Sequence, residues 1–347
     1  MQSAKECVAL QPPLPDLHPH VARLQGLRVL VVGDLTLDEY LFGRPTRLSR
    51  EAPIPVLELE QRTCILGGAA NPARNIVALG STAIPIGVVG ADPQGQQLCD
   101  LFAAAQISTA QIIVASDRPT TVKTRILAHE APRLPQQVAR LDQLARSPLT
   151  PALLAQIEVA LAAQIPHVDA VLCSDYQLGM LVDPVIAQIR QLCEQHGVLL
   201  TVDAQGNALA YHRVDLFRCN DREAAATLQR SLQHESDFRA ALPDLLDLLG
   251  ARLVIVTRGP EGLSMQGQDV PYTHLPASQL SEVYDTTGAG DTFIAVVTLG
   301  LAGGLAADAA AQLANLAAGR VVRKLGNIVV TPEELTHTMQ LLHPANR

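Results

Sequence analysis

Short apolar runs that end in polar residues alternate with helical stretches along most of this 347-residue chain. The first run, residues 27–34, has the sequence Leu-Arg-Val-Leu-Val-Val-Gly-Asp, which is typical of a buried strand. This alternation predicts a doubly wound, mostly parallel α/β sheet flanked by helices, with ligands bound beyond the carboxyl ends of its strands. Similar runs occupy residues 83–90, 170–175, 198–203 and 253–258, and helical stretches occupy residues 69–79, 151–163, 184–196, 238–249, 288–301 and 305–324.

Two parts of the chain break this alternation. Residues 55–60, and residues 111–115 with 121–127, have strand character with no helix between them. They predict a small antiparallel β lid over the ligand site, formed by about residues 39–66 and 110–142. Residues 1–26 form a polar, proline-rich leader, and residues 27–345 are expected to form one domain that carries the lid.

Charge and composition argue against several classes of function. A net charge of −8 disfavours nucleic-acid binding, which needs a basic surface. No apolar run reaches the roughly eighteen residues of a spanning helix, and the first twenty residues lack a signal-peptide pattern. We therefore expect a cytoplasmic protein with no membrane partner. The six cysteines have no zinc-site spacing. Lysine occurs only at Lys5, Lys123 and Lys324. Any bound phosphate must therefore be bound mainly by arginine side chains, backbone N–H groups or a metal ion.

The segment Asp285-Thr286-Thr287-Gly288-Ala289-Gly290-Asp291 carries the strongest chemical signal, because it directly precedes an apolar helical run. Small residues at a helix start leave backbone N–H groups free to bind an anion, and the helix dipole adds positive potential there. A carboxylate in the first turn, Asp291, can then accept a proton from an attacking hydroxyl. The structural alternative is a tight entry into a packed helix, with Asp291 as a favourable first-turn charge.

This segment resembles the signature of the ribokinase-like sugar kinases, and the resemblance covers nearly all of residues 27–339. It implies a ribokinase-like fold, ATP and Mg²⁺ as co-substrate and cofactor, Asp291 as catalytic base, and Gly288, Ala289 and Gly290 as the anion cradle. A second signature of the family occurs as Gly67-Gly68-Ala69-Ala70-Asn71. By resemblance, the sugar ligands would be Gly67, Gly68, Asn71 and Asp34. A Gly-Gly pair before a helix is also an ordinary helix entry.

Within this family, residues 32–38, 48–56, 174–176 and 324–326 are similar to kinases that phosphorylate D-glycero-D-manno-heptose 7-phosphate at C1, a step toward ADP-heptose. That similarity adds Asp38 and Asp175 as substrate contacts, and Lys123, Arg125 and Arg140 as lid cations for a second phosphate. The three cations could equally be ordinary exposed charges. The chain stops at Arg347 without a His-x-Gly-His motif, so a stand-alone kinase is expected. Relatives of this kind often dimerise through the lid, and the sequence alone leaves the oligomeric state open.

The resemblance also implies a nucleotide site. Asn220 and Glu223 match an Asn-x-x-Glu motif in which the carboxylate holds Mg²⁺ through water, although an acidic helix start would look the same. The nucleotide contacts implied by resemblance are Thr257, Arg258, Gly259, Gly262 and Asn315. Three segments depart from the closest pattern: Ala204-Gln205-Gly206 replaces Pro-Lys-Gly, Arg218-Cys219 replaces Thr-Pro, and Glu39 replaces a basic residue. The departures leave open a kinase for another sugar, or a protein that binds without catalysis.

Overall fold

The computed structural model describes residues 17–130, 134–278, 286–323, 326 and 328–342. The predicted leader up to residue 16, Asp285 of the glycine-rich segment, and Lys5 and Lys324 lie outside these ranges. None of the helices within the described ranges is both long and apolar enough to cross a membrane.

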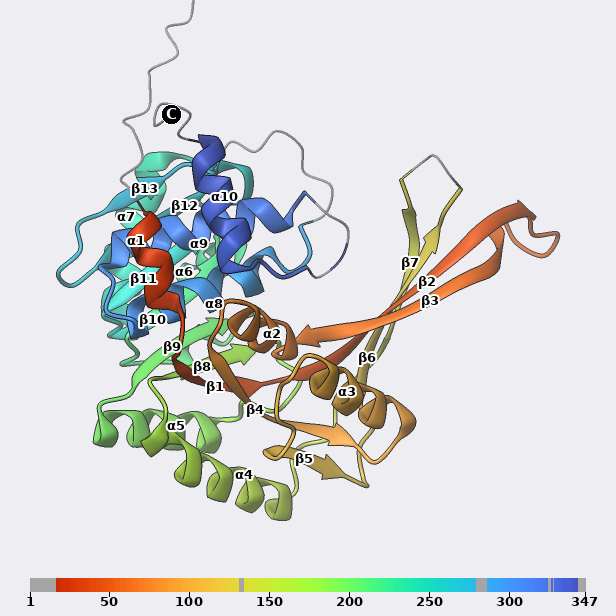
Figure 1. The fold of residues 1–347 in the computed structure, drawn as a ribbon, viewed down its shortest axis with the longest axis horizontal. Helices are drawn as coiled ribbons and strands as arrows, with labels where there is room; N and C mark the ends of the chain where they lie inside the picture. Colours follow the sequence, from red (N-terminus) through yellow and green to blue (C-terminus); the bar gives the residue numbers. More distant parts are fainter. Residues whose placement is uncertain (1–16, 131–133, 279–285, 324–325, 327, 343–347) are drawn as a thin grey trace, which may run out of the picture.

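A nine-stranded sheet forms the body, with the order β13-β12-β11-β10-β9-β8-β1-β4-β5 (Figure 1). Pairing is parallel from β5 to β11 and antiparallel for β12 and β13. The strand order reverses at β1, which lies between β8 and β4, so the crevice at its carboxyl end is the expected ligand position. The strands are β1 Arg28–Gly33, β4 Thr82–Gly90, β5 Ile112–Ala115, β8 Ala170–Asp175, β9 Leu199–Ala204, β10 Leu216–Asn220, β11 Leu253–Thr257, β12 Leu263–Gly267 and β13 Thr273–Leu275.

Helices cover both faces of this sheet, and β1 shows why. Val29 and Val31 lie in one hydrophobic cluster and Leu30 and Val32 in the other, because successive side chains of a strand point to opposite faces. The first cluster includes residues of α2 Ala70–Ala78, α3 Pro93–Ala104, α8 Ala289–Ala302, α9 Ala307–Val321 and α10 Pro332–Leu342. The second includes residues of α4 Pro151–Gln164, α5 Asp183–His196, α6 Asp221–Leu228 and α7 Glu235–Leu249. The predicted mostly parallel α/β sheet flanked by helices is confirmed.

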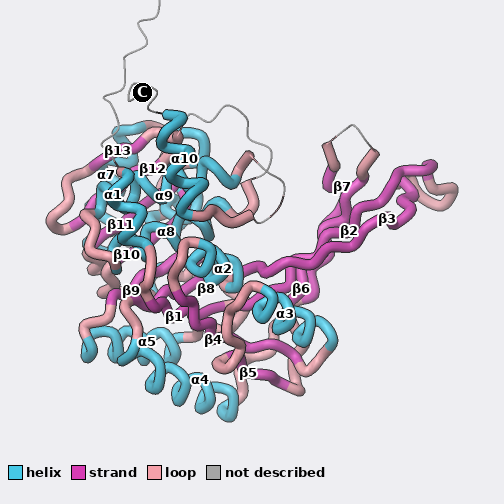
Figure 2. Tube along the Cα trace, in the orientation of Figure 1, coloured by secondary structure: helices cyan, strands magenta, loops and turns pink. Residues whose placement is uncertain are grey.

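A second, four-stranded sheet in the order β3-β2-β6-β7 extends from the body as a long arm (Figures 1 and 2). Its strands are β2 Leu35–Leu48, β3 Pro55–Gly68, β6 Thr121–Ala128 and β7 Gln136–Gln143. The expected antiparallel pairing is found for β2 with β3 and for β6 with β7, but β2 and β6 pair in parallel. The chain passes through α2, β4, α3 and β5 between β3 and β6, and this long connection allows the parallel pairing. We call this sheet the lid.

Two of the sequence-based predictions about local structure are wrong. Residues 111–115, expected in the lid, form β5, which pairs in parallel with β4 at the edge of the large sheet. The helix α3 between β4 and β5 supplies the crossover that a parallel pair requires. Within the expected polar leader, α1 His18–Val21 and η1 Ala22–Leu24 bury Leu17, Val21 and Leu24 in the core.

Candidate active site

A cavity of about 200 Å³ opens where the lid meets the carboxyl ends of β8, β9 and β10. Its walls bring together side chains that are far apart in sequence and opposite in charge. The acidic lining residues are Asp38, Asp203 and Asp291, and the basic ones are Lys123, Arg125 and Arg218. Gly288 and Gly290, at the start of α8, also line it. A phosphate ester with hydroxyl groups is the kind of ligand that such alternating charges can bind.

Asp291 lies in the first turn of α8, with 8% of its surface exposed. Asn71 Nδ2 donates a hydrogen bond of 2.7 Å to Asp291 Oδ2, and the Tyr176 hydroxyl donates one of 2.5 Å to Oδ1. Asn75 supports this arrangement, because its amide donates to the Asn71 carbonyl and accepts from Thr292, the residue after Asp291. Both carboxylate oxygens are therefore oriented by side chains from α2 and from the end of β8.

The electrostatic surroundings of Asp291 suit a proton acceptor. Burial raises the pKa of its carboxyl group to about 6, against the opposing effect of the hydrogen bonds from Tyr176 and Asn71. The neighbouring Asp203 raises the pKa further, whereas the Arg218 guanidinium lowers it. A base with a pKa near the working pH is efficient, since it is ionised yet holds a proton readily.

The start of α8 has the backbone that an anion cradle requires. Gly288 precedes the helix with φ +80°, a left-handed conformation that side-chain-bearing residues adopt at a cost. The first N–H groups of the helix have no partner within it, and the helix dipole favours negative charge at this end. Gly288 and Gly290 therefore bring backbone N–H groups to the cavity within one turn of Asp291, whereas the Ala289 N–H donates a hydrogen bond of 3.3 Å to the Thr286 carbonyl.

Strand β6 of the lid brings two cations to the cavity. Burial lowers the pKa of Lys123, whose Nζ lies 4.8 Å from the centre of the Tyr176 ring. Arg125 Nη1 lies 3.3 Å from Asp38 Oδ1. Arg140, on β7, instead makes two 2.9 Å hydrogen bonds to Asp142 and does not line the cavity. The structure thus brings two of the three sequence-predicted lid cations to the site.

The family model for the pfkB family of carbohydrate kinases matches residues 27–334, which span both sheets and every residue of this cavity. The chain belongs to the pfkB family of carbohydrate kinases. The reaction of this family is phosphoryl transfer from ATP, with Mg²⁺, to a sugar hydroxyl.

Curated relatives of this pfkB kinase include proteins named bifunctional protein HldE. The one from Trichlorobacter lovleyi is 36% identical over 322 residues, covering 92% of this chain and 64% of the relative. The one from Mesorhizobium japonicum is 38% identical over 334 residues, covering 96% of this chain and 66% of the relative. The chain thus spans slightly less than two-thirds of the length of these relatives.

Solved structures share the fold of this kinase at low sequence identity. Phosphofructokinase-2 from Escherichia coli matches with a TM-score of 0.75 and 20% identity, covering 92% of this chain and 99% of that structure. A ribokinase from Arabidopsis thaliana, complexed with ribose and ATP, matches with a TM-score of 0.70 and 16% identity, covering 91% and 99%.

Four residues assigned to the sugar by sequence hold different positions in the kinase. Gly68 lines the cavity and Gly67 precedes it at the end of β3, where both pair with β2. Asp34 does not line the cavity. Its carboxylate accepts hydrogen bonds of 3.0 Å each from the backbone N–H groups of Tyr176, Leu178 and Met180. Asp175 is likewise buried, and it accepts from Gln177 and from the Tyr211 hydroxyl. In this structure the two carboxylates organise the segment after β8.

The sequence-predicted nucleotide residues lie at or just after the carboxyl ends of β10 and β11, except Asn315, which lies on α9. Asn220 and Glu223 form a capping box at the start of α6, with hydrogen bonds of 2.9 and 2.8 Å between their side chains and backbone. Arg258 is buried over the Phe238 ring and ion-paired with Glu235 and Glu261 at 2.5 Å, and its backbone N–H donates to Gly262 across the turn at Gly259. Asn315 donates to the Pro276 carbonyl at 2.8 Å. Arg258 and Asn315 therefore have structural partners outside the cavity.

The residues at the site fit Mg²⁺ held mainly by water and phosphate. Within the described ranges, no group of three His, Cys, Asp or Glu residues could hold a metal ion by itself. Mg²⁺ needs only one or two carboxylates when phosphate oxygens and waters complete its octahedron. Burial raises the pKa of Glu223, whose carboxylate lies at the start of α6. This carboxylate would hold the ion through water.

Sequence reasoning assigned no role to Tyr176, Asp203 or Arg218, although all three line the cavity. Tyr176 follows Asp175 at the end of β8, and Asp203 lies near the end of β9, so their place at the strand ends was the available signal. For Arg218, the only indication in the sequence was that Arg218-Cys219 replaces the usual Thr-Pro before Asn220.

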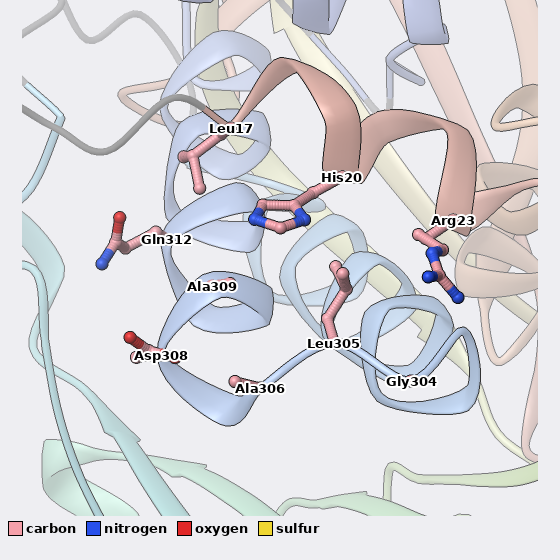
Figure 3. Close-up of a pocket in the computed structure, with 9 residues that line it drawn as sticks. All are labelled: Leu17, His20, Arg23, Gly304, Leu305, Ala306, Asp308, Ala309 and Gln312. Atoms are coloured by element: carbon pink, nitrogen blue, oxygen red, sulfur yellow. The ribbon is translucent and has the colours of Figure 1, made fainter.

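A larger cavity of about 380 Å³ lies elsewhere in the kinase (Figure 3). It is lined by Leu17, His20 and Arg23 from the N-terminal helical segment and by residues 304–306, 308, 309 and 312 around the start of α9. Most of these side chains are short or apolar, and none is a sequence-predicted site residue. The smaller, charged cavity is therefore the candidate active site.

Proposed function

We propose that this protein is an ATP-dependent kinase that phosphorylates D-glycero-D-manno-heptose 7-phosphate at C1. The observation that carries the kinase activity is Asp291, buried beside an open helix N-terminus and oriented by Asn71 and Tyr176. The similarity of residues 32–38, 48–56 and 174–176 to kinases of this heptose supports the acceptor, as does the relationship to the HldE proteins.

The residues of the site account for each part of the transfer. Asp291 takes the proton of the sugar hydroxyl as that oxygen forms a bond to the γ-phosphorus, and the bond from phosphorus to the β–γ bridging oxygen breaks to leave ADP. The backbone N–H groups of Gly288 and Gly290 bind the charge that develops on the transferred group. Mg²⁺, when bound, neutralises part of the phosphate charge.

The lid supplies the features that favour a phosphorylated acceptor. Lys123 and Arg125 reach the cavity from β6 of the lid, whereas the anion cradle is the start of the helix α8. A sugar hydroxyl directed at Asp291 would leave the far end of the sugar near these two side chains. Arginine and lysine are the usual partners of phosphate oxygens.

The test is ADP release by the wild-type kinase across a panel of heptose 7-phosphate, hexose phosphates, pentose phosphates and free sugars. The proposed function predicts the highest kcat/KM with heptose 7-phosphate. A higher value for an unphosphorylated sugar would remove the acceptor assignment. Measurable ATP binding with no turnover on any acceptor would instead indicate a protein that binds without catalysis.

Replacement of the lid cations is expected to weaken acceptor binding selectively. Lys123→Ala or Arg125→Ala should each raise KM for the sugar phosphate by about 10- to 100-fold, since a hydrogen bond to a charged group contributes about 1.5–3 kcal/mol. The KM for ATP should change little. Arg140→Ala is the matched control, because Arg140 pairs with Asp142 outside the cavity. An equal rise in KM for Arg140→Ala would show that the cavity lining does not define the acceptor site.

We also propose that the lid mediates a homodimer. Six large hydrophobic side chains that are 45–71% exposed lie on or beside its strands: Leu48, Ile54, Leu59, Leu134, Val138 and Leu141. Exposed apolar side chains gathered on one projecting sheet favour burial against a second copy. Sedimentation equilibrium at micromolar concentration should give a dimer, and Leu59→Glu with Leu141→Glu should give a monomer. A monomeric wild-type protein would contradict this proposal.

A further inference from the structure

Arg218 is the cavity-lining residue whose role is least explained by the fold. It lies on β10, with 12% of its side chain exposed. Nη1 donates to Asp203 Oδ1 at 2.8 Å and Nη2 donates to Thr257 Oγ1 at 2.7 Å. Nε is buried and has no hydrogen-bond partner within the described residues. Asp203 and Thr257 therefore orient the guanidinium without using all of its donors, since arginine has five N–H bonds.

The guanidinium lies directly against the anion cradle. A Cβ atom added to Gly290 would lie 3.0 Å from Arg218 Nη1 and 3.1 Å from Nη2, which is tighter than ordinary contact. Glycine at position 290 therefore leaves room for the guanidinium on the first turn of α8. An anion bound by the backbone N–H groups of that turn would also touch Arg218.

Other cations in the cavity lie elsewhere. Lys123 and Arg125 come from the lid, and the loop after β9 contributes the neutral Gln205. Arg218 instead lies two residues before Asn220 and donates to Thr257, so it belongs to the strand ends assigned to the nucleotide. Its charge is thus available on the nucleotide side of the cradle and not on the acceptor side.

We propose that Arg218 binds the terminal phosphoryl group of ATP together with the first turn of α8. This inference rests on the proposed kinase function for its ligand. One N–H bond remains on each of Nη1 and Nη2, which suits the bidentate contact that arginine makes with phosphate oxygens. Asp203 and Thr257 hold the fork in place before ATP arrives, which lowers the entropy lost on binding.

Calorimetric titration with Mg-ATP, Mg-ADP and AMP tests the proposal without any sugar acceptor. Arg218→Gln should weaken ATP binding by about 10- to 100-fold, weaken ADP binding much less, and leave AMP binding within about two-fold of wild type. Arg218→Lys should lose part of the ATP affinity, because an ammonium lacks the planar fork. The matched control is Arg252→Gln, which removes an exposed Arg–Asp pair at the amino end of β11 and should change none of the three affinities.

The outcomes separate this inference from the proposed function. Equal losses for ATP and ADP, or unchanged ATP affinity in Arg218→Gln, would overturn the contact with the terminal phosphoryl group. If Arg218→Gln does not fold because Asp203 is left unpaired, the double variant Asp203→Asn/Arg218→Gln removes both charges, and the same comparison of ATP with ADP applies. The wild-type protein could phosphorylate no acceptor while the Arg218 variants still lose more affinity for ATP than for ADP. That combination would contradict the proposed function and support the Arg218 contact.

Discussion

Asp291→Asn is expected to lower kcat by about 10²- to 10⁴-fold, the usual contribution of a general base. Asparagine fills the same space. Its amide oxygen can accept from Asn71 and its amide nitrogen can donate to the Tyr176 hydroxyl, so the change removes proton acceptance with little change in shape. ATP and acceptor affinities should remain within a few-fold of wild type. Initial rates of ADP release, together with calorimetric binding of ATP, check both statements. A variant that retains near wild-type kcat would remove Asp291 as the base.

The same substitution should not destabilise the protein at pH 8. Burial raises the pKa of Asp291 from 3.8 to about 6, so the native state favours the protonated form. Its contribution to stability is then present at low pH and is lost as the pH rises from about 4 through about 6, by roughly 3 kcal/mol. Asparagine lacks this ionisation, so the Tm of Asp291→Asn at pH 8 should equal or exceed that of wild type. A much lower Tm would mean that lost activity reflects unfolding.

The rate of the wild-type enzyme should depend on pH in the same range. Only the ionised carboxylate accepts a proton, so kcat/KM should fall as the pH drops below about 6. Tyr176→Phe removes a hydrogen bond that stabilises the carboxylate, so the pKa of Asp291 should rise and the fall should begin at higher pH. A pH–rate profile with the same midpoint in both proteins would contradict the assignment of this titration to Asp291.

Gly288→Ala is expected to lower kcat by about 10²- to 10³-fold, because the added Cβ turns the backbone and moves its N–H away from the anion, and loss of one donor from an oxyanion-type site has effects of this size. Gly288 has φ +80°, and an alanine there would cost about 1–2 kcal/mol or turn the backbone away from the cradle geometry. Steady-state rates and thermal unfolding would measure the two effects separately.

Gly304→Ala is the matched control for this backbone substitution. Gly304 has φ +77° just after the other end of the same helix, and a Cβ there would meet nothing within 4 Å. Both variants should therefore lose similar stability, whereas only Gly288→Ala should lose kcat. Equal kcat in the two variants would contradict the role of the residue 288–290 backbone in the transfer.

Much of the fold could be predicted from local patterns. The runs at residues 27–34, 170–175 and 253–258 correspond to β1, β8 and β11. Strand partners were harder to predict. Residues 111–115 were expected in the lid because a short apolar strand looks the same in either sheet, and only its pairing with β4 decides its place.

The site was predictable where the chemistry lies in a contiguous motif, as in residues 286–291. It was less predictable where a role depends on which neighbour a side chain reaches. Arg140 and Lys123 are both basic residues on lid strands, yet only Lys123 lines the cavity. Arg218 joins Asp203 and Thr257 across three neighbouring strands, and no spacing along the chain indicates that contact.

Asp34 accepts hydrogen bonds from three backbone N–H groups, so it is required for the shape of the site even without contact with a ligand. One of them belongs to Tyr176, whose hydroxyl reaches Asp291, so β1 fixes the loop from which the base is oriented. A genetic screen would therefore recover inactive variants at Asp34 as readily as at Asp291. In such a screen, loss of activity would identify residues that hold the site in shape as well as residues that take part in the transfer.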